Sequence, residues 1–280
     1  MLRIITDTGS DITYNAAKKM GITSLEIDVK FEGIEYDYRS DEDFSVFFKN
    51  LINSKNLPST SQVTPAQYLE EFKAAKEAGD EVLVITLSSG LSATIQSAHM
   101  AQKEIEYNQI SIVDSKSAVL AQRILINEAI KLNEQGVARL EIADWLTELR
   151  ERISLFGCLD TLTYLKKGGR VPPAMAFIGN ALKIKPIVFV QNADGKLGSL
   201  GKPRGTAAAK SIVWKKMEEE GFDEKYSVQF GCTGDPVYGR EFMNETVEKL
   251  KIKSSEYHPI GPVIGTHIGP RAFVATYIRK

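Results

Sequence analysis

Residues 86–94 carry five hydroxyl side chains around one glycine, and they raise the first chemical question. Within them, Gly90-Leu91-Ser92-Ala93-Thr94 differs only at its last position from G-x-S-x-G, the nucleophile elbow of many hydrolases. A catalytic triad would also need an acid and a histidine later in the chain. Of the three histidines, His99, His258 and His267, the first falls inside the helix predicted after the turn. His267, in the Gly-rich segment 265–270, is the only good candidate for the base. A serine esterase using Ser92 and His267 is therefore one hypothesis.

The same turn is also suited to binding an anion without chemistry. A strand pattern precedes it and a helix pattern follows it, so hydroxyls and backbone N–H groups at the helix start favour negative charge. Thr60-Ser61-Gln62, shortly before Pro65, is a second hydroxyl-rich turn before a helix, although capping alone explains such residues. The missing final glycine and the scarce triad partners favour a Ser92 that holds a carboxylate or phosphate.

Asp7-Thr8-Gly9-Ser10 matches the D-T-G-S motif of aspartic proteases, which need two such motifs to pair their carboxylates. This chain has one, followed by a helix pattern, so a protease is not indicated. Asp7 is then a cap for the next segment or, in a third hypothesis, a metal ligand for phosphate chemistry. That hypothesis lacks a nucleotide loop, because residues 166–170 do not have the spacing of a P-loop.

The elements that must position these residues alternate between two patterns. Strand patterns cover 2–6, 22–29, 82–86 and 110–113, and helix patterns lie between and after them. This alternation predicts a parallel α/β domain over 1–155, flavodoxin- or Rossmann-like, with helices on both faces of the sheet. Ligands of such sheets sit at the carboxyl ends of the strands, where Asp7, the serine turn and Asp114 fall.

A second, α+β domain is expected over 156–280. Its β-prone stretches are 186–190, 226–231 and 263–267, and its helical ones are 205–220 and 236–250. The turns Lys166–Arg170 and Lys202-Pro203-Arg204 are basic and are most simply solvated. The apolar segment 174–184 is core by default or, alternatively, the lining of an apolar tunnel.

Composition narrows the class of partner. The chain has 280 residues with a net charge of −1, so it offers no general attraction to nucleic acid or anionic membranes. It shows no signal-peptide pattern and no apolar run approaching the ~18 residues of a membrane span, so we expect no stable membrane insertion. The distant Cys158 and Cys232 suggest neither a disulfide framework nor a zinc site, and a cytoplasmic protein is the simplest expectation.

Taken in order along the whole chain, these segments resemble the DegV family of bacterial fatty-acid-binding proteins. The resemblance rests on Thr6–Asp11, Thr60–Gln62, Ser88–Ala98, Val113–Ser115, Leu165–Arg170, Lys202–Arg204 and Gly261–Pro270. It implies two α/β domains with one long-chain fatty acid, similar to palmitate, stearate or oleate, in a buried tunnel between them. No metal or other cofactor is implied, and the lead hypothesis is a carrier rather than an enzyme.

The resemblance also implies roles for named residues. The hydroxyls of Thr60, Ser61 and Ser92 hold the carboxylate, with His267 close by. Family members that serve a fatty acid kinase present the bound acid to it for acyl-phosphate formation, and Arg170 and Arg204 resemble the positions engaged at that step. Two departures stand out, because the family usually has Gly at the positions of Ala93 and Arg271. Arg271 either pairs with the acid or alters access to it.

Overall fold

Strands from the first part of the chain form one parallel sheet. The computed structural model describes residues 1–35, 39–175 and 183–280. Sheet A has the order β2-β1-β6-β7, with β1 at Leu2–Asp7, β2 at Thr23–Leu25, β6 at Glu81–Thr86 and β7 at Ile110–Asp114. All three of its strand pairings are parallel. The predicted parallel sheet is confirmed.

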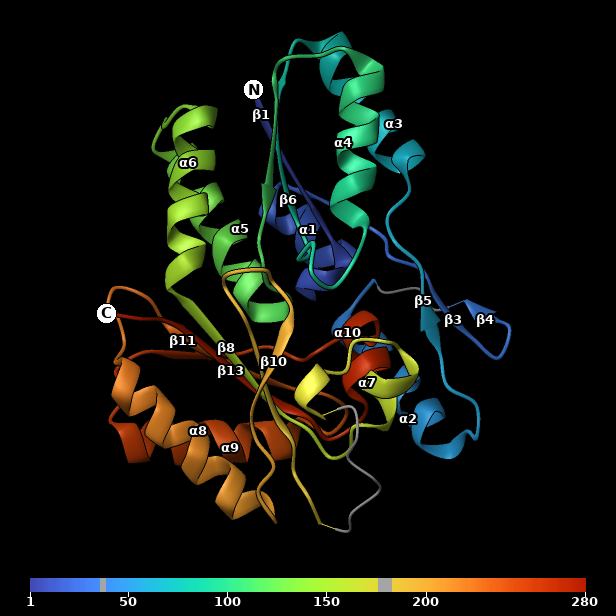
Figure 1. Cartoon of the computed structure of the whole chain (residues 1–280). Coiled ribbons are helices and arrows are strands. Elements are labelled where there is room, and N and C mark those ends of the chain that lie inside the picture. The colour runs from blue at the N-terminus through green and yellow to red at the C-terminus, as the bar shows by residue number, and fades with distance from the viewer. Residues whose placement is uncertain (36–38, 176–182) are drawn as a thin grey trace.

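Helices cover both faces of sheet A, also as predicted. α3 (Pro65–Ala78) and α4 (Thr94–Ile105) pack on one side, and α5 (Val119–Glu134) and α6 (Arg139–Leu149) on the other (Figure 1). The earlier α1 (Tyr14–Met20) and α3 begin at Thr13 and Thr64, whose side chains accept hydrogen bonds from the first turn. Both of these helices end at a glycine in the left-handed region, Gly21 and Gly79.

A second sheet, sheet C, contains the later strands. Its order is β10-β9-β8-β13-β11-β12, antiparallel except for the last pair. The strands are β8 (Ile153–Cys158), β9 (Ile187–Val190), β10 (Leu197–Gly201), β11 (Val228–Cys232), β12 (Ser255–Tyr257) and β13 (Phe273–Ile278). α8 (Thr206–Glu220) and α9 (Pro236–Leu250) cover one face. Because side chains alternate along β8, Phe156 and Cys158 pack with these helices, while Ile153 and Leu155 belong to the apolar cluster shared with sheet A.

A small third sheet and three helices, two of them short, lie beside the junction of the two sheets. The sheet has the order β4-β3-β5, with β3 at Val29–Phe31, β4 at Ile34–Glu35 and β5 at Ser59–Thr60. The helices are α2 (Asp41–Asn53), α7 (Thr163–Lys167) and α10 (Pro262–Ile268). Short 3-10 turns occur at Thr8–Ser10, Arg150–Arg152 and Pro173–Met175. In Figure 1, α2, α7 and α10 lie together below α3 and α4.

Two element predictions were wrong. The strand expected at 22–29 is split between sheets, because the Ile27 N–H bonds to Thr8 Oγ1 at 2.9 Å instead of to a neighbouring strand. The segment 263–267, expected as β-prone, is helical. Pro262 starts that helix, α10, and the Gly265 N–H donates to the Gly261 carbonyl at 2.8 Å. His267 therefore sits on the last turn of a helix and not in a loop.

The two sheets share one apolar cluster, which includes Ile5 and Val84 of sheet A and Val188 and Val274 of sheet C. The predicted boundary at 155/156 falls inside β8. As a proposal, we place the boundary between two domains at the start of that strand. None of the helices in the described ranges combines the length and the apolar character that crossing a membrane requires.

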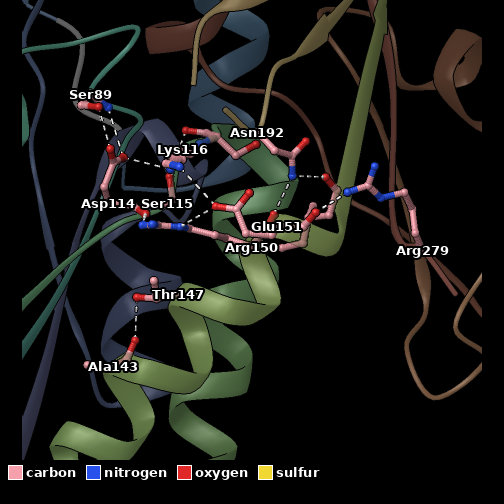
Figure 2. A network of polar contacts seen from close by, with 12 residues as sticks. Ser89, Asp114, Ser115, Lys116, Ala143, Thr147, Arg150, Glu151, Asn192 and Arg279 are labelled. Carbon is pink, nitrogen blue, oxygen red and sulfur yellow. Dashed lines mark hydrogen bonds and ion pairs between the residues drawn. The ribbon is translucent and has the colours of Figure 1, made fainter. Parts of the chain in front are cut away.

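A polar network ties the carboxyl end of β7 to sheet C (Figure 2). Asp114 accepts hydrogen bonds from the Ser89 hydroxyl at 2.6 Å and, through its backbone carbonyl, from Arg150 at 2.6 Å. Asn192, in the loop between β9 and β10, donates to the Arg150 carbonyl at 2.8 Å. The Glu151 carboxylate forms an ion pair with Lys116, and the Glu151 backbone carbonyl accepts a hydrogen bond from Arg279. These contacts fix how the sheets meet on this side of the molecule.

Candidate functional site

An apolar pocket lies between the carboxyl ends of sheet A and the face of sheet C that turns away from α8 and α9. The space between its walls is about 830 Å³, solvent at the mouth included. Its apolar walls are Ile27, Leu87, Leu91, Ala118, Val119, Leu155, Leu159, Leu165, Val188, Phe189, Val190, Leu197, Val263, Ile264, Ile268 and Val274.

The polar side chains in the lining come from four separate segments. Thr60 (β5), Ser92 (the turn after β6), Arg170 (the loop after α7) and His267 (α10) all border the pocket. Thr60 Oγ1 lies 2.9 Å from His267 Nε2, although the two residues are 207 positions apart. Arg170 donates to the carbonyl of Leu91, next to Ser92, at 3.1 Å. The Thr60–His267 contact, the Ser92 hydroxyl and the Arg170 guanidinium therefore all border one apolar space.

His267 is held as a neutral imidazole. Burial, with a smaller effect from the positive Arg170, lowers its pKa to about 4. Its Nδ1 is buried and has no hydrogen-bond partner among the described residues. A buried acceptor without a partner is less costly than a buried N–H without one, so we infer that the proton is on Nε2 and is donated to Thr60. The Thr60 hydroxyl hydrogen is then free to point at a ligand.

Gly168 makes room for that imidazole. A Cβ at this position would lie 2.9 Å from His267 Cε1 and closer still to Nδ1. The backbone of Gly168 has φ −75, which any residue adopts, so only the side-chain space requires glycine. Sequence reasoning did not identify this residue as part of the site, because its neighbour is 99 positions away.

Ser92 sits just before α4, with Ala93 at the cap position. Its Oγ lies 3.0 Å from Thr94 Oγ1 and accepts from the Thr94 N–H at 3.2 Å. This leaves the Ser92 hydroxyl able to donate to a ligand in the pocket. Ala93 has φ −86, so an alanine in place of the usual glycine introduces no backbone strain.

The remaining predicted residues lie in different surroundings. Ser61 borders the pocket, but its hydroxyl donates to Asp28 at 3.3 Å. Arg204 is exposed, forms an isolated bridge with Ile184 and does not line the pocket. Arg271 is also exposed, does not line the pocket and adopts φ +60, a conformation that explains why glycine suits its position. Of the proposed tunnel segment 174–184, residues 176–182 lie outside the described ranges.

A further contact, missed from the sequence, closes one wall of the pocket. The Ser88 side chain is fully buried and donates to the Gly195 carbonyl, in the loop between β9 and β10, at 2.8 Å. A Cβ at Gly90 would lie 2.5 Å from the Asp194 carbonyl oxygen. The serine turn therefore supports the β9–β10 hairpin, whose strands supply Val188, Phe189, Val190 and Leu197 to the walls.

Asp7 does not border the pocket. It is fully buried, and its carboxylate accepts from the backbone N–H groups of Gly9 at 3.0 Å and Leu87 at 2.8 Å. Burial outweighs these bonds and raises its pKa to about 6. Its position links the turn after β1 to the turn after β6. Across the described ranges, no group of three or more His, Cys, Asp or Glu side chains is placed to hold a metal ion.

Comparisons with known proteins agree with the motifs. A family model described as "Uncharacterised protein, DegV family" matches residues 1–280. A DegV domain-containing protein of Clostridium perfringens is 30% identical over 272 residues, covering 95% of this chain and 93% of its own. A "fat acid (stearic acid)-binding protein" of Eubacterium ventriosum has a TM-score of 0.87 at 26% identity, and the match covers 100% of this chain and 99% of that one. A DegV family protein of Thermus thermophilus, described for its fatty acid binding, has a TM-score of 0.85 at 25% identity, covering 99% of each chain. The predicted resemblance is confirmed, and this chain belongs to the DegV family.

Proposed function

We propose that this protein binds one long-chain fatty acid, with the acyl chain in the apolar pocket and the carboxylate at Thr60, Ser92 and His267. The observation that carries the proposal is an apolar pocket bordered by the hydroxyls of Thr60 and Ser92 and by the imidazole of His267, which contacts Thr60. The stearic acid named for the Eubacterium ventriosum relative supports the choice of ligand. Ser61 is a weaker contact in this proposal, because Asp28 already accepts from its hydroxyl.

The energetics of such a ligand fit these surroundings. Each buried CH₂ contributes about 0.8 kcal/mol, so a C16 chain gains on the order of 10 kcal/mol before the costs of binding. A carboxylate leaves water only if donors replace its hydration, and charge-assisted hydrogen bonds are the stronger kind. The hydroxyls of Thr60 and Ser92 supply such donors. The approach of a carboxylate also raises the pKa of His267, which strengthens its role as a donor.

The protein is, in this proposal, a carrier that presents the acid to a fatty acid kinase. Arg170 is exposed and borders the pocket, and its guanidinium donates to the Gly168 carbonyl at 2.5 Å. It is the first proposed contact with the kinase. Arg204 is the second proposed contact with the kinase. Replacing either arginine with alanine should leave fatty-acid affinity within about twofold, since neither is needed for the hydroxyl contacts, and should slow acyl-phosphate formation. Equal kinase kinetics for both variants and wild type would remove the two arginines from the proposal.

The serine esterase hypothesis requires His267 to accept the Ser92 proton and an acid to orient His267. Here Nε2 contacts Thr60 instead of Ser92, and Nδ1 has no acidic partner among the described residues. The phosphate-chemistry hypothesis requires an accessible Asp7, which is buried. Neither alternative has an observation in its favour. Failure of a fluorophosphonate to label Ser92, with no turnover of p-nitrophenyl esters, would eliminate the esterase.

The first test is chemical identification of the ligand. Solvent extraction of the purified protein followed by mass spectrometry should yield a long-chain fatty acid in about stoichiometric amount. The delipidated protein should take up palmitate or oleate in a calorimetric titration. If neither acid binds and nothing is extracted, fatty-acid binding is refuted.

The second test concerns the head group. Thr60→Ala should weaken palmitate binding roughly 10- to 150-fold, the loss of one hydrogen bond to a charged group. Ser59→Ala is the matched control, because Ser59 is exposed and is the other residue of the two-residue strand β5. Ser92→Ala should weaken binding similarly, with Ser89→Ala, in the same turn but bonded to Asp114, as its control. An unchanged affinity in the Thr60→Ala/Ser92→Ala double variant would refute the placement of the carboxylate.

A further inference from the structure

α10 has only seven residues, yet it carries a large share of the pocket wall. Val263, Ile264, His267 and Ile268 all border the pocket. A helix this short is not stable by itself in water. Its position, and with it the position of His267, must therefore be set by contacts with the rest of the protein.

Asp11 provides the contact at the start of α10. Its Oδ1 accepts from the Gly261 N–H at 2.9 Å, across 250 positions of sequence. That N–H belongs to the N-cap residue. Glycine permits the approach, because a Cβ at position 261 would lie 3.0 Å from Asp11 Oδ1 and 2.8 Å from the Phe44 ring.

The Asp11 carboxyl is itself fixed by the turn that follows β1. Asp11 adopts φ 55 and its N–H donates to the Thr8 carbonyl at 3.3 Å. The side chain is buried, and Oδ2 has no hydrogen-bond partner in the described part of the chain. Arg123 is the nearby positive group, Asp41 the nearby negative one, and burial raises the pKa of Asp11 to about 8. A buried carboxyl with one unsatisfied oxygen is costly, so its presence at this position calls for an explanation beyond stability.

The far end of α10 is held from the other sheet. Thr233, which follows β11, is fully buried, and its Oγ1 donates to the Gly269 carbonyl at 2.7 Å. Gly269 is two residues beyond His267 and ends the helix. The two ends of α10 are therefore held by hydrogen bonds to Asp11, which follows a strand of sheet A, and to Thr233, which follows a strand of sheet C.

We propose that Asp11 is a positioning residue of the fatty-acid site: by holding Gly261 it sets α10 so that His267 meets Thr60, and Thr233 secures the other end. Asp11 is the last residue of the segment Thr6–Asp11. It lies outside the strands of sheet A and does not border the pocket, so this role is additional to both. The effect on ligand affinity rests on the proposed function. The effect on His267 does not, and it is measurable without ligand.

The test compares Asp11→Ala, Asp11→Asn and a matched control in the delipidated full chain. Asp11→Asn keeps an oxygen that accepts from Gly261, so it is the conservative rescue. Glu128→Ala is the control, because Glu128 is also a buried carboxylate, bonded to Trp145 and Lys131, and does not border the pocket.

The first readout is the pH titration of the His267 imidazole by NMR, which is assignable because the chain has 3 histidines. The second is palmitate affinity by calorimetry.

In wild type, Asp11→Asn and Glu128→Ala, His267 should stay neutral down to a pH of about 4. In Asp11→Ala, α10 loosens, the imidazole gains access to water, and His267 should titrate about one pH unit higher. Palmitate affinity should fall about tenfold in Asp11→Ala alone. An unchanged His267 titration in Asp11→Ala, or an equal change in Glu128→Ala, would overturn the proposal. Palmitate binding by none of the proteins would refute the proposed function and leave the NMR result to decide the role of Asp11.

Should Asp11→Ala not fold, Gly261→Ala carries the same test. Its new Cβ pushes the first turn of α10 away from Phe44 and Asp11 while the carboxyl remains. The backbone there has φ −84, which alanine adopts, so only the contacts of the new Cβ displace the helix. The same upward shift of the His267 titration is expected, and its absence would count against Asp11 as decisively as in the first variant.

Discussion

Substituting Gly168 with alanine disturbs the contact between His267 and Thr60 in the proposed binding site. The added Cβ would lie 2.9 Å from Cε1 of His267, and closer to Nδ1, so the imidazole must move. The backbone conformation of Gly168 suits alanine, but displacing a buried ring should cost about 1–3 kcal/mol of the free energy of unfolding. The displaced ring loses its 2.9 Å contact with Thr60, which orients the hydroxyl toward the ligand.

The expected loss of palmitate binding free energy in Gly168→Ala is that of one charge-assisted hydrogen bond. Such a bond contributes about 1.5–3 kcal/mol, which corresponds to a roughly 10- to 150-fold weaker palmitate Kd. Calorimetric titration of delipidated protein measures the Kd, and urea unfolding measures the stability. The matched control is Gly169→Ala, where φ is +71 and nothing lies within 4 Å of the new Cβ. That variant should lose about 1 kcal/mol of stability and bind palmitate normally. Unchanged binding by Gly168→Ala, or equally weak binding by both variants, would refute the account of the site.

Two other predictions use different measurements. Because the pKa of His267 is lowered from 6.5 to about 4, its contribution to stability is complete above pH 6.5 and is lost as the pH falls toward 4. Thermal denaturation should therefore show a smaller drop in Tm between pH 7 and pH 4.5 for His267→Gln than for wild type, and an equal drop would contradict the lowered pKa. Ser88→Ala removes the buried bond to Gly195, so it should cost about 1–2 kcal/mol in urea unfolding and release palmitate faster in stopped-flow exchange. Unaltered release would show that the β9–β10 hairpin stays in place without this bond.

The parallel sheet could be predicted because its strands are continuous apolar runs separated by amphipathic helices. β6 is buried along nearly its whole length, and Gly79 ends the helix before it, so periodicity and turn chemistry agree there. The small third sheet could not be predicted in the same way. Its strands have two or three residues, which is too short for any periodic pattern.

α10 was mistaken for a strand because Val263 and Ile264 are β-branched and glycines flank them. What makes the segment helical is tertiary: Pro262 starts it, Phe48 packs against Gly265, and Tyr164 packs against Gly269. The hydroxyls of Thr60 and Ser92 were predicted as site residues from the turns that carry them and from the family resemblance, and both border the pocket. The contact of Thr60 with His267 joins residues 207 positions apart, and no local pattern encodes such a pairing.

The position of β13 in sheet C has a consequence for synthesis of the protein. β13 lies between β8 and β11, although both are made before it, and it contributes Val274 to the pocket. While the chain emerges from the ribosome, sheet A can form early, but sheet C stays divided into two unjoined parts. The apolar face that later surrounds the pocket is then open to solvent. Closure of the pocket is therefore expected to be a late event on the folding pathway, and a nascent chain stalled before residue 273 should bind chaperones and not lipid.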